Sequence, residues 1–133
     1  MPDVVKTTQT RGVVDARTAM YAMQNTGLVC GEDIEAGHAC RIGAGFKVFK
    51  AKAGDARFDG IAPKSMKAGQ PITLFGVGTR FHATEGTLAA EPGLYYLSTT
   101  PGLFSDTATG AGKPVARAVS RHDLEIIRVG GEV

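Results

Sequence analysis

From Leu28 to Val129, short apolar runs alternate with clusters of glycine, proline and polar residues. Each run is four to seven residues long and rich in β-branched or aromatic residues, whereas the clusters between them are typical of turns. The predicted strands are residues 39–42, 46–51, 58–62, 71–77, 79–83, 94–98, 114–120 and 124–129. Strands of this length and spacing predict a mainly β fold, either a small antiparallel β-barrel or a β-sandwich.

Three of the predicted turns share one pattern, in which a charged residue and then Ala or Pro precede a glycine at the start of a strand. The glycines are Gly37, Gly69 and Gly93. Glycine adopts positive φ without steric cost, so we expect each of them to turn the chain into its strand without strain. The intervals of 32 and 24 residues differ, which indicates a reused turn and not a solenoid repeat.

Residues 13–27 fit two structures equally well. Ala16, Met20 and Met23 recur at the spacing of one helix face, and Gly27 would end such a helix. In strand alternation, Tyr21 and Met23 instead share one face. Periodicity alone therefore leaves this segment open between helix and strand.

The N-terminal segment is too polar to fold alone, because one valine pair is followed by a threonine-rich stretch. It suits an extended arm that adds to the sheet edge of another chain, and a frayed terminus is the alternative. We accordingly divide the chain into an arm and connecting segment, residues 1–27, and a β-rich domain, residues 28–133. The predicted arm residues are Val4, Val5, Lys6, Thr7, Thr8, Gln9 and Thr10.

The chain carries more large aromatic side chains than one small barrel interior accepts. Adjacent residues of a strand point to opposite faces, so one side chain of each neighbouring pair must find cover outside the barrel. A subunit interface would provide that cover. The candidate interface residues are Phe49, Phe75, Phe81, Tyr95 and Tyr96.

Composition narrows the class of protein. The 133 residues are 43% hydrophobic, enough for the core of a single domain, and the formal net charge of +2 does not indicate nucleic-acid binding. No apolar stretch approaches the length of a membrane span, and the first residues do not resemble a signal peptide. We therefore expect a protein made and folded in a cytosol, without a membrane or a nucleic acid as partner.

The two cysteines, Cys30 and Cys40, do not form a CxxC redox or zinc motif. In a reducing compartment they are expected to be small, reduced core or edge residues. A disulfide between them, or between subunits, is the alternative.

No pattern in the sequence indicates catalysis. His38, His82 and His122 are isolated from one another and lack metal-ligand spacing, so neither a metal site nor a cofactor is expected. Residues 76–79 (GVGT) lack the motif of a phosphate-binding loop and are interpreted as a hairpin turn. These observations favour a binding or structural role over an enzyme.

The order of turns and strands, with the phrases FDGIA, AGQPITLFGVG and PGLYYLS, resembles the capsid cement, or head decoration, proteins of tailed bacteriophages. The resemblance covers about residues 28–129. It implies a non-enzymatic β-rich protein that is made in the host cytoplasm and lies on the outer surface of the virion. It also implies a partner, the major capsid protein, contacted by the N-terminal segment, and a homotrimer that strengthens the shell against internal DNA pressure.

Two other interpretations remain open from the sequence. A small β-barrel ligand-binding module would use His38, His82 or His122 in a pocket. A tail or baseplate component of the same kind of particle would share this composition.

Overall fold

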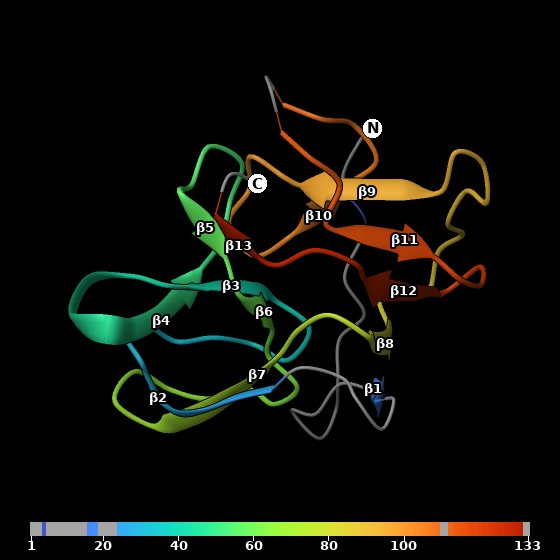
Figure 1. The fold of residues 1–133 in the computed structure, drawn as a ribbon. Helices are drawn as coiled ribbons and strands as arrows, with labels where there is room; N and C mark the ends of the chain where they lie inside the picture. The colour runs from blue at the N-terminus through green and yellow to red at the C-terminus, as the bar shows by residue number, and fades with distance from the viewer. Residues whose placement is uncertain (1–3, 5–15, 19–23, 110–111, 132–133) are drawn as a thin grey trace.

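A computed structural model describes Val4 and residues 16–18, 24–109 and 112–131 (Figure 1). These residues form β1 (Ala16–Thr18), β2 (Gln24–Cys30), β3 (Ala39–Ile42), the 3-10 turn η1 (Ala44–Phe46), β4 (Lys47–Lys50), β5 (Arg57–Phe58), β6 (Gly60–Ile61), β7 (Pro71–Phe75), β8 (Thr79–His82), β9 (Leu94–Leu97), β10 (Phe104–Ser105), β11 (Ala116–Ala118), β12 (Asp123–Ile126) and β13 (Gly130–Gly131). The predicted mainly β fold is confirmed. No helix among the described residues is long and apolar enough to cross a membrane.

Five strands close into a barrel in the order β2-β4-β3-β6-β7. Four of its pairs are antiparallel, whereas β2 and β4 run parallel. β2 carries an irregularity between Asn25 and Leu28, where its pairing with β7 shifts register. The barrel is therefore mixed, which differs in this one pair from the purely antiparallel barrel that the sequence predicts.

Six other strands form an antiparallel sheet beside the barrel, in the order β1-β8-β12-β11-β9-β10. A two-stranded pair, β13 with β5, lies at the junction of the two parts (Figure 1). For the described residues of 13–27, β1 and β2 decide the open question in favour of strand. β2 begins at Gln24 and so runs across the proposed boundary after residue 27.

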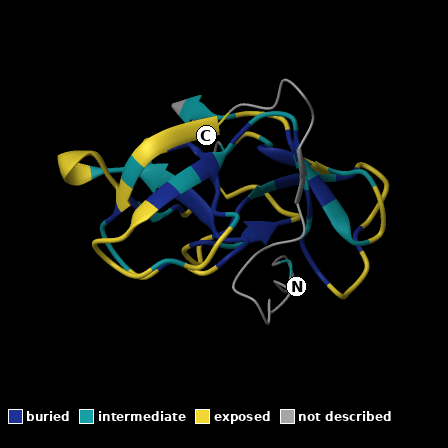
Figure 2. Cartoon of the chain, turned by 90° about the horizontal axis from the view of Figure 1, so that it is seen from below, coloured by how far each residue is buried: buried dark blue, intermediate teal, exposed yellow. Residues whose placement is uncertain are grey.

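The molecule has two hydrophobic cores. One fills the barrel and contains Cys30, Cys40 and Leu74, while the other lies between the barrel and the six-stranded sheet. β3 serves both cores, because Ala39 packs in the second core and its neighbour Cys40 packs in the first. Figure 2 shows the buried residues concentrated in the strands of both parts.

The second core buries two of the five candidate interface residues, Phe81 and Tyr95. Phe104 packs against Phe81, with ring centres 5.9 Å apart, and against Phe58 at 6.2 Å. Phe81 is 2% exposed and Tyr95 is 4% exposed. The assignment of these two residues to a subunit interface is therefore corrected: a single chain covers both, because the fold has two interiors and not one.

The three repeated turns behave as predicted, since Gly37, Gly69 and Gly93 have φ values of 89°, 88° and 74°. The hairpin predicted at residues 76–79 is wrong. β7 belongs to the barrel and β8 to the six-stranded sheet, so this turn carries the chain from one part to the other. The N–H of Gly78 donates to the carbonyl of Ile126, which holds the turn against the sheet.

Asp59 divides the strand that the sequence predicts at residues 58–62 into β5 and β6. Its buried carboxylate accepts hydrogen bonds from the N–H of Ile42 at 2.8 Å and from the Arg57 guanidinium at 2.6 and 2.8 Å. Gly60 follows with φ 133°. A buried carboxylate needs such partners, so its side chain turns toward them and the strand breaks at this point.

Candidate functional site

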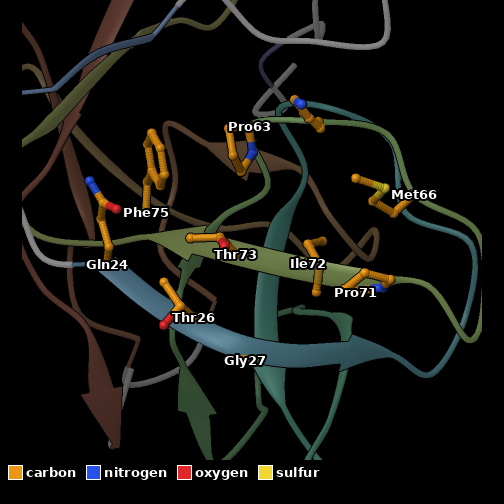
Figure 3. Close-up of a pocket in the computed structure, with 10 residues that line it drawn as sticks. Gln24, Thr26, Gly27, Pro63, Met66, Pro71, Ile72, Thr73 and Phe75 are labelled. Carbon is orange, nitrogen blue, oxygen red and sulfur yellow. The ribbon is translucent and has the colours of Figure 1, made fainter.

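An open groove of about 550 Å³ lies on the outer side of the barrel, beside β7 (Figure 3). β2 and β7 form one side, and the segment 63–66 lies across from them. The lining residues are Gln24, Thr26, Gly27, Pro63, Lys64, Met66, Pro71, Ile72, Thr73 and Phe75. Five of these residues, Pro63, Met66, Pro71, Ile72 and Phe75, carry apolar side chains, so the groove offers apolar surface together with a few polar groups.

Strand alternation explains how β7 forms both the core and the groove. Ile72 and Leu74 are buried in the barrel, whereas Thr73 and Phe75 are half-buried on the other face. Across the groove, the backbone of Met66 exchanges two hydrogen bonds with Ile34, both at 2.8 Å. Segment 63–66 is thereby held away from β7, and the groove between them is part of the fold.

An exposed row continues from the groove across three strands. Val29 of β2 pairs with Lys47 of β4 on one side and with Pro71 of β7 on the other. Paired residues point to the same face of a sheet, so these three side chains share the outside of the barrel. Val29 is 38% exposed.

Phe46 lies in η1, directly before Lys47 in the sequence, and is 82% exposed. Its φ of 59° is strained for a residue with a bulky side chain. The turn is held by the N–H of Phe46, which donates to the carbonyl of Gly43 at 3.0 Å. A large aromatic ring is thus presented to solvent by a defined backbone conformation.

Phe49, a predicted interface residue, finds cover within its own chain. The guanidinium carbon of Arg41 lies 5.3 Å from the centre of its ring. A Cβ at Gly31 or at Gly43 would meet that ring at 2.5 and 2.8 Å, so the absent side chains leave space for it. Phe49, Phe75 and Tyr96 are half-buried.

The charges around the groove are unequal. Lys64 lines it, Lys47 stands in the adjoining row, and both are exposed. No aspartate or glutamate is among the lining residues. The nearby acidic group Asp33 already forms an ion pair with Lys67 at 3.8 Å. The groove therefore presents an apolar surface with a net positive rim.

Among the predicted arm residues, Val4 lies within the described part of the chain and residues 5–10 lie outside it. The N–H of Val4 donates to the carbonyl of Phe104 at 2.8 Å, at the β10 edge of the six-stranded sheet. Val4 also packs against the second core, beside Phe81 and Gly102. The arm begins at a sheet edge of its own chain.

The two cysteines are free and buried in the barrel core. Burial, followed by the nearby Asp33 carboxylate, raises the pKa of the Cys30 thiol. Burial also raises the pKa of Cys40, whose Sγ donates to the carbonyl of His38 at 3.4 Å. Both side chains therefore behave as small apolar core residues with protonated thiols.

The histidines do not line one pocket. The rings of His82 and His122 lie 5.5 Å apart, and His82 contacts Glu85 at 2.6 Å and Asp123 at 3.6 Å. His38 borders a separate hollow of about 370 Å³ that neither of the others lines. In the described ranges, no group of three or more His, Cys, Asp or Glu side chains is arranged to hold a metal ion.

Sequence reasoning did not find the groove, since its walls come from three segments that only the folded chain brings together: 24–27, 63–66 and 71–75. The sequence predicts Phe46 as the first residue of a strand, whereas it lies in η1, and the glycines at 43 and 45 are the signal that the chain turns there. A comparison with models of protein families finds no match, and a comparison with curated protein sequences finds no relative.

Proposed function

We propose that this protein is a capsid decoration protein that binds the outer surface of an assembled tailed-phage head. The observation that carries the proposal is the exposed apolar surface formed by the groove, Val29 and Phe46. Large aromatic side chains held at the surface are typical anchors of protein interfaces. The order of strands and turns, which resembles that of phage cement proteins, supports the same class of partner.

The proposed partner is the major capsid protein, and the proposed state is a homotrimer. Several modest contacts made at once by linked subunits give high total avidity, which suits a protein that must stay attached to a repetitive shell. The net charge of +2 suits this role as well, because it limits nonspecific capture by DNA. The protein transforms no substrate and needs no cofactor for such a role.

Sedimentation with purified heads tests the proposal. Heads that lack decoration are mixed with the protein, and bound protein is measured in the pellet. Phe46→Gly removes the exposed ring while keeping a residue suited to positive φ, so we expect a normal fold and a several-fold loss of binding. Gly45→Ala is not a suitable control, because it adds strain at φ 69°.

Thr99→Ala, at an exposed position beyond β9 on the six-stranded sheet, is the matched control and should bind as the unchanged protein does. If the unchanged protein binds no head preparation but labels tails or baseplates in electron micrographs, the capsid proposal is refuted. The protein would then be a tail or baseplate component. Labelled shells that carry the protein at regular positions would support it.

A small-ligand module is the second candidate function, and the volume of the groove favours it. About 550 Å³ lies within the usual range of small-molecule sites, and the lining is largely apolar with few polar groups. The separated histidines give it no support. Native mass spectrometry of the purified protein decides: a stoichiometric bound small molecule that Phe75→Ala releases would establish this function.

A further inference from the structure

We infer that the groove beside β7 binds an extended polypeptide segment with acidic and apolar side chains, which adds to β7 as a further strand. The inference rests on the proposed function, because both treat the groove as a surface that binds a protein partner. It adds the chemistry of the segment that is bound.

The first argument is the free edge of β7. One edge pairs with β2 along the strand, whereas on the other edge the described residues give a single pair, Ile61 with Phe75. Residues 71–74 therefore have no strand partner on the groove side within the described ranges. An unpaired strand edge is a template for an incoming strand.

The second argument concerns which backbone groups face the groove. The N–H of Cys30 donates to the carbonyl of Gln70. This bond shows which residues of β7 direct their backbone groups toward β2. Because bonding direction alternates along a strand, Ile72 turns its N–H and C=O toward β2, and Thr73 turns its own away. Thr73 thus offers one donor and one acceptor to a peptide in the groove.

The third argument is that the opposite wall of the groove does not supply hydrogen-bond partners for the N–H and C=O of Thr73. Met66 bonds to Ile34, and the N–H of Ala62 donates to the carbonyl of His38 at 3.1 Å. The backbone groups of Ala62 and Met66 are therefore bonded to residues 34–38 and not to β7. Pro63 and Met66 present apolar side chains toward the groove (Figure 3).

The fourth argument is charge. Lys64 on the rim and Lys47 in the adjoining row carry positive charge without an acidic residue among the lining side chains. An acidic side chain of the partner would find complementary charge there, and its apolar neighbours would contact Met66 and Phe75. The occupant is accordingly a protein segment, and a small molecule without a peptide backbone would leave the Thr73 groups unused.

Fluorescence anisotropy with designed peptides tests the inference on the isolated protein. The probe is the fluorescein-labelled, end-blocked heptapeptide GVDIEVG, and the comparison peptides are GVKIKVG and GVDPEVG. We expect the acidic peptide to bind, and both comparison peptides to bind about tenfold more weakly or worse, through lost charge complementarity and a lost backbone donor respectively. Equal binding of all three peptides, or no binding of any, would overturn the inference.

Two variants locate the binding. Thr73→Pro removes the backbone donor on the groove side, and Thr73→Val keeps it, so the first should lose about tenfold in affinity and the second little. Lys64→Glu should weaken binding of GVDIEVG several-fold, whereas Arg121→Glu, exposed beyond the six-stranded sheet, should not. Unchanged binding by Lys64→Glu would overturn the inference even where Thr73→Pro does not fold.

Amide hydrogen exchange of the unchanged protein gives an independent readout. The Thr73 N–H should exchange more slowly when GVDIEVG is bound, and unaltered exchange at saturation would contradict strand addition. Peptide binding by a protein that does not sediment with heads would refute the capsid proposal and keep the inference. Head binding that is unaffected by Thr73→Pro and Lys64→Glu would refute the inference and keep the capsid proposal.

Discussion

The ring of Phe58 meets the ring of Phe104 edge-on, with centres 6.2 Å apart and planes at 87°. Phe58 belongs to β5, which continues into the barrel strand β6, and Phe104 belongs to β10 of the six-stranded sheet. This contact therefore joins the two parts of the molecule through the core that they share.

Phe104→Ala should lower the free energy of unfolding by about 3–5 kcal/mol, the usual effect of deleting a buried phenyl ring. Urea unfolding followed by circular dichroism measures this loss. Phe104→Leu, which keeps much of the volume, should cost less. A loss below about 1 kcal/mol for the alanine variant would show that the aromatic contact does not hold the two parts together.

Gly60→Ala should destabilise the protein by about 3 kcal/mol. Gly60 has φ 133°, and an added Cβ would overlap the backbone carbonyl of Phe75, which cannot move without breaking the pairing of β6 with β7. Gly69→Ala is the matched control: φ is 88° but nothing lies within 4 Å, so it should cost only about 1 kcal/mol. Equal melting temperatures for the two variants would contradict this account.

The thiols should make the protein less stable at alkaline pH. The pKa of Cys40 is raised above its ordinary value of 9.0 by burial, and that of Cys30 is raised in the same direction. Above pH 9.0 the unfolded chain releases these protons and the folded chain keeps them, so the free energy of unfolding falls by at most about 1.4 kcal/mol per pH unit for each thiol. Below that pH the contribution is fully present.

Urea unfolding at about pH 8 and at about pH 10 measures the effect. Cys40→Ala should lose less stability over this range than the unchanged protein. Native protein should also react slowly with dithionitrobenzoate, and both thiols should react after unfolding. Fast labelling of the folded protein would show that the barrel core is open to reagents.

Deletion of residues 2–12 should leave a folded domain that binds heads poorly. Val4 is the one residue of that segment that the structure describes, and its side chain lies at the margin of the second core. We therefore expect a modest loss of stability. Sedimentation with heads measures binding, and thermal unfolding measures the fold. A truncated protein that binds normally would remove the arm from the capsid contact without affecting the proposed role.

Light scattering at low protein concentration tests the proposed trimer. We expect a mass of three chains, each of 13.9 kDa, that persists on dilution. A mass of one chain would contradict a trimer formed before binding to the shell. Phe81 and Tyr95 would not contribute to the trimer interface, because a single chain covers both.

Local patterns were sufficient to predict much of the fold. The bounds of β3 agree with the predicted strand at 39–42, and β9 differs by one residue, because alternation and the preceding glycine turns mark both clearly. The closing of five strands into a barrel and the second core were not predictable in the same way. Which face of Phe81 or Phe58 is covered depends on strands distant in the sequence.

The candidate site was harder to predict from the sequence than the fold. Met66 and Thr73 lie on opposite walls of the groove because Ala62 and Met66 are hydrogen-bonded to residues 34–38. No local pattern in the sequence predicts that pairing. The sequence does predict the kind of site, because the lack of any catalytic motif favours a binding surface over an active site. An exposed Phe46 at positive φ is visible only in three dimensions.

Ala39 and Cys40 place consecutive side chains of β3 in two separate interiors. Adding or removing one residue in this strand would move each following side chain from one core to the other. The length of β3 is therefore constrained more tightly than that of a strand with one solvent-exposed face. Loops such as 85–87 and 106–109 are exposed and border no such shared wall. An inserted epitope or a fused enzyme would be tolerated there, and not along the strand that both interiors share.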